Sequence, residues 1–316
     1  MTQSLQAYLE HKRTVDDRAL NDRVWSAFVD GLAELAAFED SNGRPNEPVR
    51  VLEIGGGVGT MVARLAERDA LAPSVSYRLV DLDERNVEYA RQHLPEWLEE
   101  AGYEVERRRS SVLARSTDER SADQTVEVHL EAGDAFEAPD RDGERSEADA
   151  VIASAVLDTV DLEYALGRIP DLLRTGGLLY APITYDGTTT FSPPDPLDER
   201  LTELYNRHMD EIRDRPGSSR AGRELFAALD RPGSEFDLLE VGGSDWIVRP
   251  RDGAYPADEK AFLRQLLETI DGALAAYPET ALAPTDRQRW VDTRLSQLER
   301  GELSLIARHL DVLARL

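Results

Sequence analysis

Strand-like and helix-like hydrophobic patterns alternate along this 316-residue chain. Short apolar runs are typical of buried strands, whereas apolar residues spaced three or four apart form one face of a helix. The first half of the chain therefore predicts, in order, strand 49–54, helix 58–69, strand 76–81, helix 83–100, strand 125–131, strand 149–154, helix 161–174 and strand 177–184. This alternation favours a mostly parallel sheet covered by helices on both faces.

Helical patterns also flank this alternating region. Residues 3–38 carry a stripe of apolar residues at every fourth position, which predicts one or two amphipathic helices. Further helices are expected over 195–231, around 262–274 and over 285–315. The additions at both ends are therefore expected to be helical.

Two polar segments, 107–124 and 139–147, interrupt the alternation and are expected to be surface loops. The first is expected at the tip of a β-hairpin whose strands lie on either side. Residues 236–250 predict two short strands around a Gly-Gly turn.

A glycine-rich stretch follows the first strand in "VRVLEIGGGVGTMVARL", residues 49–65. Glycines between a buried strand and a helix let the backbone approach a ligand closely and direct free N–H groups at it. The stretch therefore predicts a cofactor. A dinucleotide fingerprint would need glycine or alanine at Thr60, where the helix packs, so that pattern is incomplete.

The same stretch fits the pattern ExGxGxG, with Glu53, Gly55, Gly57 and Gly59, and resembles motif I of class I S-adenosylmethionine-dependent methyltransferases. The segments "YRLVDLDERNVEYAR", "EAGDAFE", "ADAVIASAVLDTVD" and "LLRTGGLLYAPI" resemble the later motifs of this family, in the family's order. A wider resemblance, through "KRTVDDRALN" and "GELSLIARHLDVL", is to uncharacterised bacterial and haloarchaeal methyltransferases.

The resemblance implies a doubly wound, mostly parallel, seven-stranded α/β sheet of the class I methyltransferase type, with N- and C-terminal helical additions. It also implies S-adenosylmethionine as cofactor. Glu53 would orient the methionine end, Asp81 would accept hydrogen bonds from the ribose hydroxyls, and Asp134 would lie near the adenine amino group. The other residues implied at this site are Gly55, Gly57, Gly59, Leu82, Ala135 and Ser154.

Each acid also has an ordinary structural interpretation. Glu53 could be a helix-cap partner, and Asp81 and Asp134 could be common strand-end acids in an acidic chain. Asp83 fits the N-cap of the next helix equally well.

Candidates for acceptor chemistry lie beyond strands four and five, where ligands bind in open α/β sheets. A methyl acceptor needs positioning and, for a hydroxyl, amine or acidic carbon, a base. The candidate bases are Asp158, Asp186 and His208, and the candidate substrate-binding residues are Tyr185, Arg220 and Arg223. Solvated acids, a structural histidine and surface ion pairs are the alternatives.

The predicted organisation is an N-terminal helical lid (1–46), a Rossmann-like S-adenosylmethionine-binding domain (47–250) and a C-terminal helical extension (251–316). Helices at both ends could enclose a small-molecule acceptor or instead form a homodimer. As a lid, the first segment would bring Tyr8, Lys12 or Arg13 near the methionine or acceptor end.

The charge balance excludes some partners. The formal net charge is −25, which disfavours nucleic acid and anionic membranes as partners. Only Lys12 and Lys260 are lysines, so nearly all 37 basic residues are arginines, a composition similar to that of halophile proteins. The chain has no cysteine and no spaced histidine pair, so no metal site is expected. A polar N-terminus without a signal-peptide pattern predicts a soluble, cytoplasmic protein.

The expected activity is methyl transfer from S-adenosylmethionine to a small molecule by in-line displacement. One alternative is an NAD(P)-dependent oxidoreductase, which the missing YxxxK pair and Thr60 disfavour. The other is a non-catalytic S-adenosylmethionine-binding regulatory protein, which would share the glycine motif and lack turnover.

Overall fold

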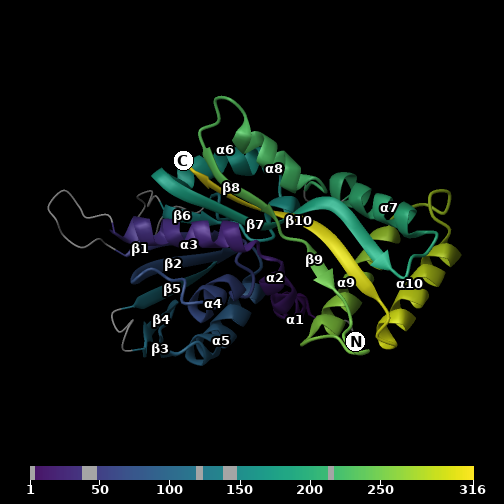
Figure 1. The fold of residues 1–316 in the computed structure, drawn as a ribbon, viewed down its shortest axis with the longest axis horizontal. Helices are drawn as coiled ribbons and strands as arrows, with labels where there is room; N and C mark the ends of the chain where they lie inside the picture. The colour runs from purple at the N-terminus through teal and green to yellow at the C-terminus, as the bar shows by residue number, and fades with distance from the viewer. Residues whose placement is uncertain (1–3, 38–47, 119–123, 138–147, 213–216) are drawn as a thin grey trace.

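The protein is built around one large mixed sheet (Figure 1). The computed structural model describes residues 4–37, 48–118, 124–137, 148–212 and 217–316. Ten strands are found in these residues, in the order β3-β4-β5-β2-β1-β6-β7-β10-β8, with β9 paired to β10. They are β1 (Val49–Ile54), β2 (Ser74–Asp81), β3 (Tyr103–Arg107), β4 (Ser111–Ser116), β5 (Thr125–Ala132), β6 (Ala148–Ile152), β7 (Leu173–Ser192), β8 (Asp237–Gly243), β9 (Trp246–Val248) and β10 (Ser304–Arg315).

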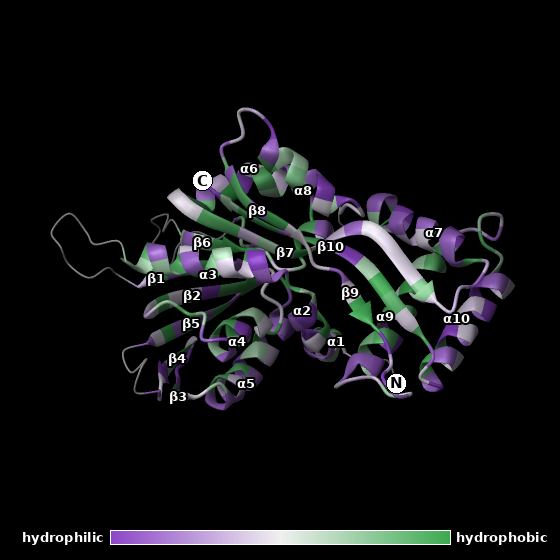
Figure 2. Cartoon of the chain, in the orientation of Figure 1, coloured by the Kyte–Doolittle hydropathy of each residue, from purple (hydrophilic) through white to green (hydrophobic). Residues whose placement is uncertain are grey.

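The five strands β5, β2, β1, β6 and β7 are parallel neighbours, which confirms the predicted doubly wound sheet. Two helical layers cover it, with α6 and α8 on one face and α3, α4 and α5 on the other (Figure 1). These helices are α3 (Asp22–Ala37), α4 (Thr60–Glu67), α5 (Glu84–Glu100), α6 (Leu162–Leu172) and α8 (Ala221–Asp230). Apolar residues gather on the strands and on the inward faces of the helices, as the hydropathy colours show (Figure 2).

The C-terminal segment differs from the sequence-based expectation. The predicted helix over 285–315 is wrong in its second half, because residues 304–315 form strand β10, antiparallel to both β7 and β8. Leu305 and Ala307 point inward while Ile306 and Arg308 point outward, the two-residue period of a strand. A short apolar run is ambiguous between helix and strand, and pairing with β7 and β8 decides it here.

Strand β7 is also longer than the predicted strand 177–184. It bends near Ile183, which has a positive φ of 57°, and continues beside β10 to Ser192. The predicted Gly-Gly turn is not a turn, because Gly242 and Gly243 lie in β8 and pair with β10. Strand β9 pairs with the outer part of β10 and not with β8.

The expected hairpin around 107–124 is wrong in its pairing. Strand β3 pairs with β4, which lies inside the segment expected to be a loop, and β4 in turn pairs antiparallel with β5. The added strands β3, β4 and β9 make the sheet ten-stranded in place of seven.

The remaining helices surround the long arm formed by β7, β9 and β10 (Figure 1). They are α1 (Leu5–His11), α2 (Arg13–Ala19), α7 (Asp198–Glu211), α9 (Glu259–Leu274) and α10 (Pro284–Glu299). Helix α1 contacts both α5 and α9, so it lies between the parallel sheet and the arm. The predicted domain boundary at 46/47 and the predicted loop 139–147 fall outside the described residues.

Candidate functional site

The glycine loop after β1 brings backbone close to neighbouring side chains. Gly55 and Gly57 have positive φ values of 62° and 55°, a conformation that disfavours other residues. A Cβ atom on Gly55 would lie 2.6 Å from Cγ2 of Val156, and one on Gly56 would lie 2.4 Å from Cγ of Leu79. The loop therefore requires glycine for steric reasons.

A cavity of about 970 Å³ opens beside this loop, at the carboxyl ends of β1, β2, β5 and β6. Gly59, however, faces away from it. A Cβ atom there would meet Leu79 and Ala90 at 3.5 and 3.6 Å, so Gly59 serves helix packing. Every other residue expected at the cofactor site lines the cavity: Glu53, Gly55, Gly57, Asp81, Leu82, Asp134, Ala135 and Ser154.

Glu53 ends the strand beneath the glycine loop and is almost fully buried. Its Oε2 accepts a hydrogen bond from the Tyr77 hydroxyl at 2.8 Å. Burial raises the pKa of Glu53 to about 8, although the hydrogen bond from Tyr77 and the charge of Arg64 oppose this shift. A cationic ligand beside Glu53 would favour its ionised form.

Asp81 ends β2 and organises the loops around it. Its Oδ2 accepts from the Gly57 N–H at 2.9 Å, and its Oδ1 accepts from the Asp83 N–H at 2.9 Å and from Asn86 Nδ2 at 3.0 Å. Each carboxylate oxygen has two lone pairs, so Oδ2 retains acceptor capacity toward the cavity. Asp83 accepts from the Arg85 N–H and is the N-cap of α5, which confirms that alternative for Asp83.

Asp134 follows β5 at another wall of the cavity. Its Oδ1 accepts from the Phe136 N–H at 2.9 Å, which fixes the turn and the direction of the carboxylate. Phe136 and Tyr164 also line the cavity, and their rings meet edge to face at 5.7 Å between centroids. Leu82 adds apolar surface to the cavity lining. A carboxylate beside aromatic and apolar side chains is suited to binding a heteroaromatic ring.

Helix α1 lies over the glycine loop. Leu5, Leu9 and Lys12 line the cavity, and a Cβ atom on Gly57 would lie 3.3 Å from Cδ1 of Leu9. Near its start, Gln6 donates to Asn86 Oδ1 at 2.7 Å, and Asn86 in turn donates to Asp81. The N-terminal segment is therefore part of the cavity wall.

An aromatic cluster adjoins the Lys12 end of the cavity. Tyr8 stacks on Phe262 at 5.5 Å between centroids, Trp246 contacts Phe262 at 5.3 Å and His309 at 4.3 Å, and Tyr185 contacts His309 at 5.5 Å. These five residues come from α1, α9, β9, β10 and β7. We call them the aromatic cluster.

Polar groups surround the aromatic cluster. Burial raises the pKa of Tyr185 to about 12, with further contributions from Tyr205 and Asp158. The pKa of Tyr8 is raised by burial and by the same two neighbours together with Asp16. Burial lowers the pKa of His309 to about 3, so its imidazole is neutral at physiological pH.

Two of the proposed acceptor-site residues, Tyr185 and Asp158, are near this cluster or the cavity, and His208 is further along α7. Tyr185 is a member of the cluster, and its hydroxyl donates to Asn206 Oδ1 at 3.0 Å. Asp158 lies in a short 3-10 helix (Leu157–Thr159) that follows β6, directly before Thr159, which lines the cavity. His208 lies on α7, as Tyr205 does, and does not line the cavity.

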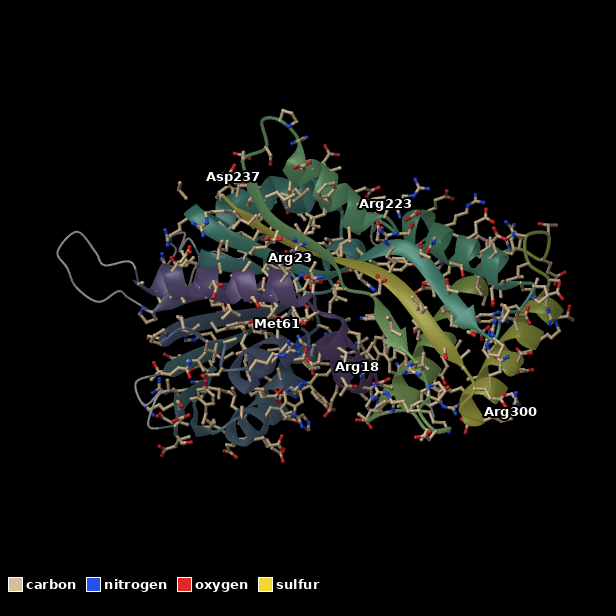
Figure 3. The ribbon with its side chains drawn as sticks, in the orientation of Figure 1. Arg18, Arg23, Met61, Arg223, Asp237 and Arg300 are labelled. Atoms are coloured by element: carbon tan, nitrogen blue, oxygen red, sulfur yellow. The ribbon has the colours of Figure 1, made fainter. Side chains whose placement is uncertain are left out.

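Asp186 and Arg223 do not support the roles expected from the sequence. Asp186 is buried, and its carboxylate accepts from Arg223 Nε at 2.7 Å and Nη2 at 3.1 Å, with Arg308 Nε at 3.4 Å. Each proposed group therefore neutralises the other. Arg220 is the N-cap of α8 and Arg223, labelled in Figure 3, lies in its first turn. Neither is among the residues that line the cavity. Acceptor binding by these two arginines stays a prediction from the sequence.

The sequence patterns missed several residues of the cavity and the cluster. Asn86 and Phe136 could have been found, because each lies within five residues of a predicted acid. Trp246, Phe262 and His309 carry no local signal, since only the fold brings them together.

Neither a membrane span nor a metal centre is evident in the described residues. No helix there is long and apolar enough to cross a bilayer. Nor do three or more histidine and acidic side chains gather in that part of the chain in a way that could hold a metal ion.

The chain matches no protein-family model and no curated protein. Among solved structures it is similar to a geranyl diphosphate methyltransferase in complex with GPP and sinefungin, at 13% identity and a TM-score of 0.41, over 92% of this chain and 78% of that one. It is also similar to geranyl diphosphate C-methyltransferase from Streptomyces coelicolor A3(2), at 13% identity and a TM-score of 0.38, over 92% and 77% of the chains. A mycolic acid cyclopropane synthase complexed with SAH and CTAB gives 14% identity and a TM-score of 0.37, over 92% and 83%. At these TM-scores the similarities do not establish a family for this chain.

Proposed function

We propose that the cavity binds S-adenosylmethionine and that the protein transfers its methyl group to a small molecule. One observation carries this proposal: acids at three successive strand ends, Glu53, Asp81 and Asp134, line a single cavity with the glycine loop. A carboxylate suits the ammonium of the methionine end, the ribose hydroxyls and the adenine amino group, because all three are hydrogen-bond donors.

The residues fit each part of this cofactor. Glu53 would bind the ammonium, Asp81 would accept from a ribose hydroxyl, and Asp134 would accept from the adenine amino group, with Phe136 and Tyr164 beside the ring. When bound, the sulfonium supplies an activated methyl group that needs no electrophilic help. The protein's contribution is to position the acceptor in line with that methyl group and to exclude water.

The sheet supports this proposal over an NAD(P)-dependent oxidoreductase. The common dinucleotide fold is an all-parallel sheet in the order 3-2-1-4-5-6. Here β10 is inserted between β7 and β8 and runs antiparallel to both. An all-parallel dinucleotide-binding sheet has no antiparallel strand at this position.

The acceptor would lie between the cavity and the aromatic cluster. Helices α1 and α9 supply two members of the cluster, and Tyr185 donates a hydrogen bond to Asn206 on α7. This partly enclosed apolar surface favours a small molecule over a macromolecular substrate. Asp158 is our candidate for the proton acceptor, because it is close enough for its negative charge to raise the pKa of both Tyr8 and Tyr185. His208 is a weaker candidate, since it lies on α7 outside the cavity lining.

Calorimetry with S-adenosylhomocysteine and NAD tests the cofactor assignment. We expect micromolar-range binding of S-adenosylhomocysteine, on the order of −8 kcal/mol, and no heat with NAD. NAD binding without S-adenosylhomocysteine binding would reject the proposal.

Turnover separates an enzyme from a regulatory protein. Incubation with S-adenosylmethionine and pools of small amines, phenols and carboxylic acids should release S-adenosylhomocysteine above the level seen without acceptor. An Asp158→Asn variant should bind S-adenosylhomocysteine normally and release less of it. Tight binding without turnover on any pool would favour the regulatory alternative.

A further inference from the structure

Helix α1 runs along the cavity from its Asp81 side toward Asp16 and Trp246. Gln6 is linked through Asn86 to Asp81, and Leu9, one turn further on, approaches Gly57. Lys12 follows another turn later and lines the cavity together with Asp16. Lys12 therefore lies about two turns beyond the residue linked to Asp81, the proposed ribose position, and it lines the same cavity as Glu53.

Lys12 differs in charge from the other ionisable residues that line this cavity. Among the described residues that line it, Lys12 has the one cationic side chain, and all the other charged residues are acidic. The side chain is largely buried, with the residue 8% exposed. A lysine is rarely buried without a charged partner or ligand.

Neighbouring groups hold the ammonium in place. Lys12 Nζ lies 2.7 Å from Asp16 Oδ2, and Asp16 Oδ1 accepts from Trp246 Nε1 at 2.9 Å. Nζ also lies 5.3 Å from the centre of the Trp246 ring, within the range of a cation–π interaction. An ammonium has three N–H donors, and Asp16 engages one side of it.

We infer that Lys12 binds the carboxylate of the amino-acid end of the cofactor, while Glu53 binds its ammonium. This inference rests on the proposed function. A carboxylate entering a cavity lined by acids would be repelled unless a cation offsets that charge, and Lys12 is the group available to do so. The N-terminal helix then supplies one half of the recognition of a zwitterion, and the parallel sheet supplies the other.

The competing explanation is structural: Lys12 could serve only to fix α1 against Asp16 and Trp246. Paired ligands distinguish the two. S-Adenosylhomocysteine carries the carboxylate, whereas decarboxylated S-adenosylhomocysteine lacks only that group. We expect Lys12→Met to weaken binding of S-adenosylhomocysteine roughly 10- to 100-fold and to change binding of the decarboxylated ligand less than about 3-fold.

Two control variants accompany this measurement. Lys12→Arg keeps a cation and should retain most of the preference for the carboxylate-bearing ligand. Arg13→Met removes a neighbouring cation that stacks on Trp97 and pairs with Glu67, and it should leave the preference unchanged. Thermal melting of each variant checks that it is folded.

An equal loss of affinity for both ligands in Lys12→Met, or no loss for either, would overturn the inference. Failure of the proposed function looks different, because the wild-type protein would then bind neither ligand. If Lys12→Met does not fold, Lys12→Gln provides the same comparison with a neutral side chain that can still hydrogen-bond to Asp16.

Discussion

The cavity at the parallel sheet and the aromatic cluster at the β7–β10 arm are formed in different ways. In the parallel sheet, Glu53, Asp81 and Asp134 each lie within two residues of the end of a strand, and the glycine loop follows the first of these strands. In the arm, the aromatic cluster draws one residue from each of five separate elements. One surface is therefore determined by local strand ends, and the other depends on long-range packing.

This difference predicts how each surface responds to mutation. A change at a strand end should affect ligand binding with little effect on folding, because the strand's own pairing is retained. A change where distant elements meet should mainly reduce stability, because it leaves buried groups of several elements unpaired.

The largest expected effect is at Asp311, where the two regions are joined. This buried carboxylate accepts from the Ile183 N–H at the bend of β7 and from the Asn21 N–H before α3, each at 2.8 Å. Asp311→Ala leaves both donors unpaired and should lower the free energy of unfolding by about 2–4 kcal/mol. Urea denaturation measures this loss, and Asp311→Asn, which keeps one acceptor, should lose less. A change in the free energy of unfolding below about 0.5 kcal/mol in the alanine variant would contradict the proposal that Asp311 stabilises the contact between the two regions.

Asp81→Ala should have the largest effect on binding. It removes the proposed acceptor for a ribose hydroxyl and also releases the Gly57 N–H. Affinity for S-adenosylhomocysteine should fall by about 1.5–3 kcal/mol in calorimetry. The matched variant Asp83→Ala removes the cap of α5 and should cost about 1 kcal/mol of stability with a smaller effect on affinity. Unchanged affinity in Asp81→Ala would show that the carboxylate at the end of β2 does not bind the ribose.

Binding at Glu53 should depend on pH. Because burial raises its pKa to about 8, Glu53 is mostly protonated in the free protein at pH 7. An ammonium favours the ionised form, so binding should release close to one proton at pH 7, and affinity should rise as the pH approaches 8. Calorimetry at pH 7 in buffers of different ionisation enthalpy measures this release, which Glu53→Gln should abolish. A binding enthalpy independent of the buffer would rule out this coupling.

The same shift predicts a stability difference. Protonated Glu53 favours the folded state, so this contribution is fully present below the ordinary pKa of 4.5 and is lost as the pH rises through about 8. Free Glu53→Gln protein should therefore gain melting temperature relative to wild type as the pH is raised from 5 to 9. A difference that stays constant over this range would contradict the raised pKa.

The smallest expected effect is on the dynamics of the N-terminal helices, which contact both regions. Saturating S-adenosylhomocysteine should slow amide hydrogen exchange over residues 8–24, because Leu9 and Lys12 would then cover bound ligand. Mass spectrometry of exchange with and without ligand measures this. Protection confined to the core strands would show that these helices have a structural role and do not cover the ligand.

The sequence alone predicted most about the cavity whose residues lie at the ends of parallel strands. The spacing of Glu53, Gly55 and Gly57 and the acids at later strand ends predicted the residues that line the cavity, since carboxyl ends of parallel strands meet at one edge. The sequence did not predict that Asp186 and Arg223, 37 positions apart, bind each other. A sequence does not show which of many charged residues are already paired.

Strand β10 shows the same limit in the fold. Its alternation of buried and exposed residues is present in the sequence, but a short apolar run permits either helix or strand. Neighbours from β7 and β8 decided the outcome by supplying backbone partners on both sides. The sequence by itself determined the parallel sheet and its glycine loop, because local periodicity and steric limits act within a few residues. The aromatic cluster, the hydrogen bonds of Asp311 to Ile183 and Asn21, and the position of Lys12 beside Trp246 are determined only by the tertiary structure. Each depends on contacts between segments far apart in the chain.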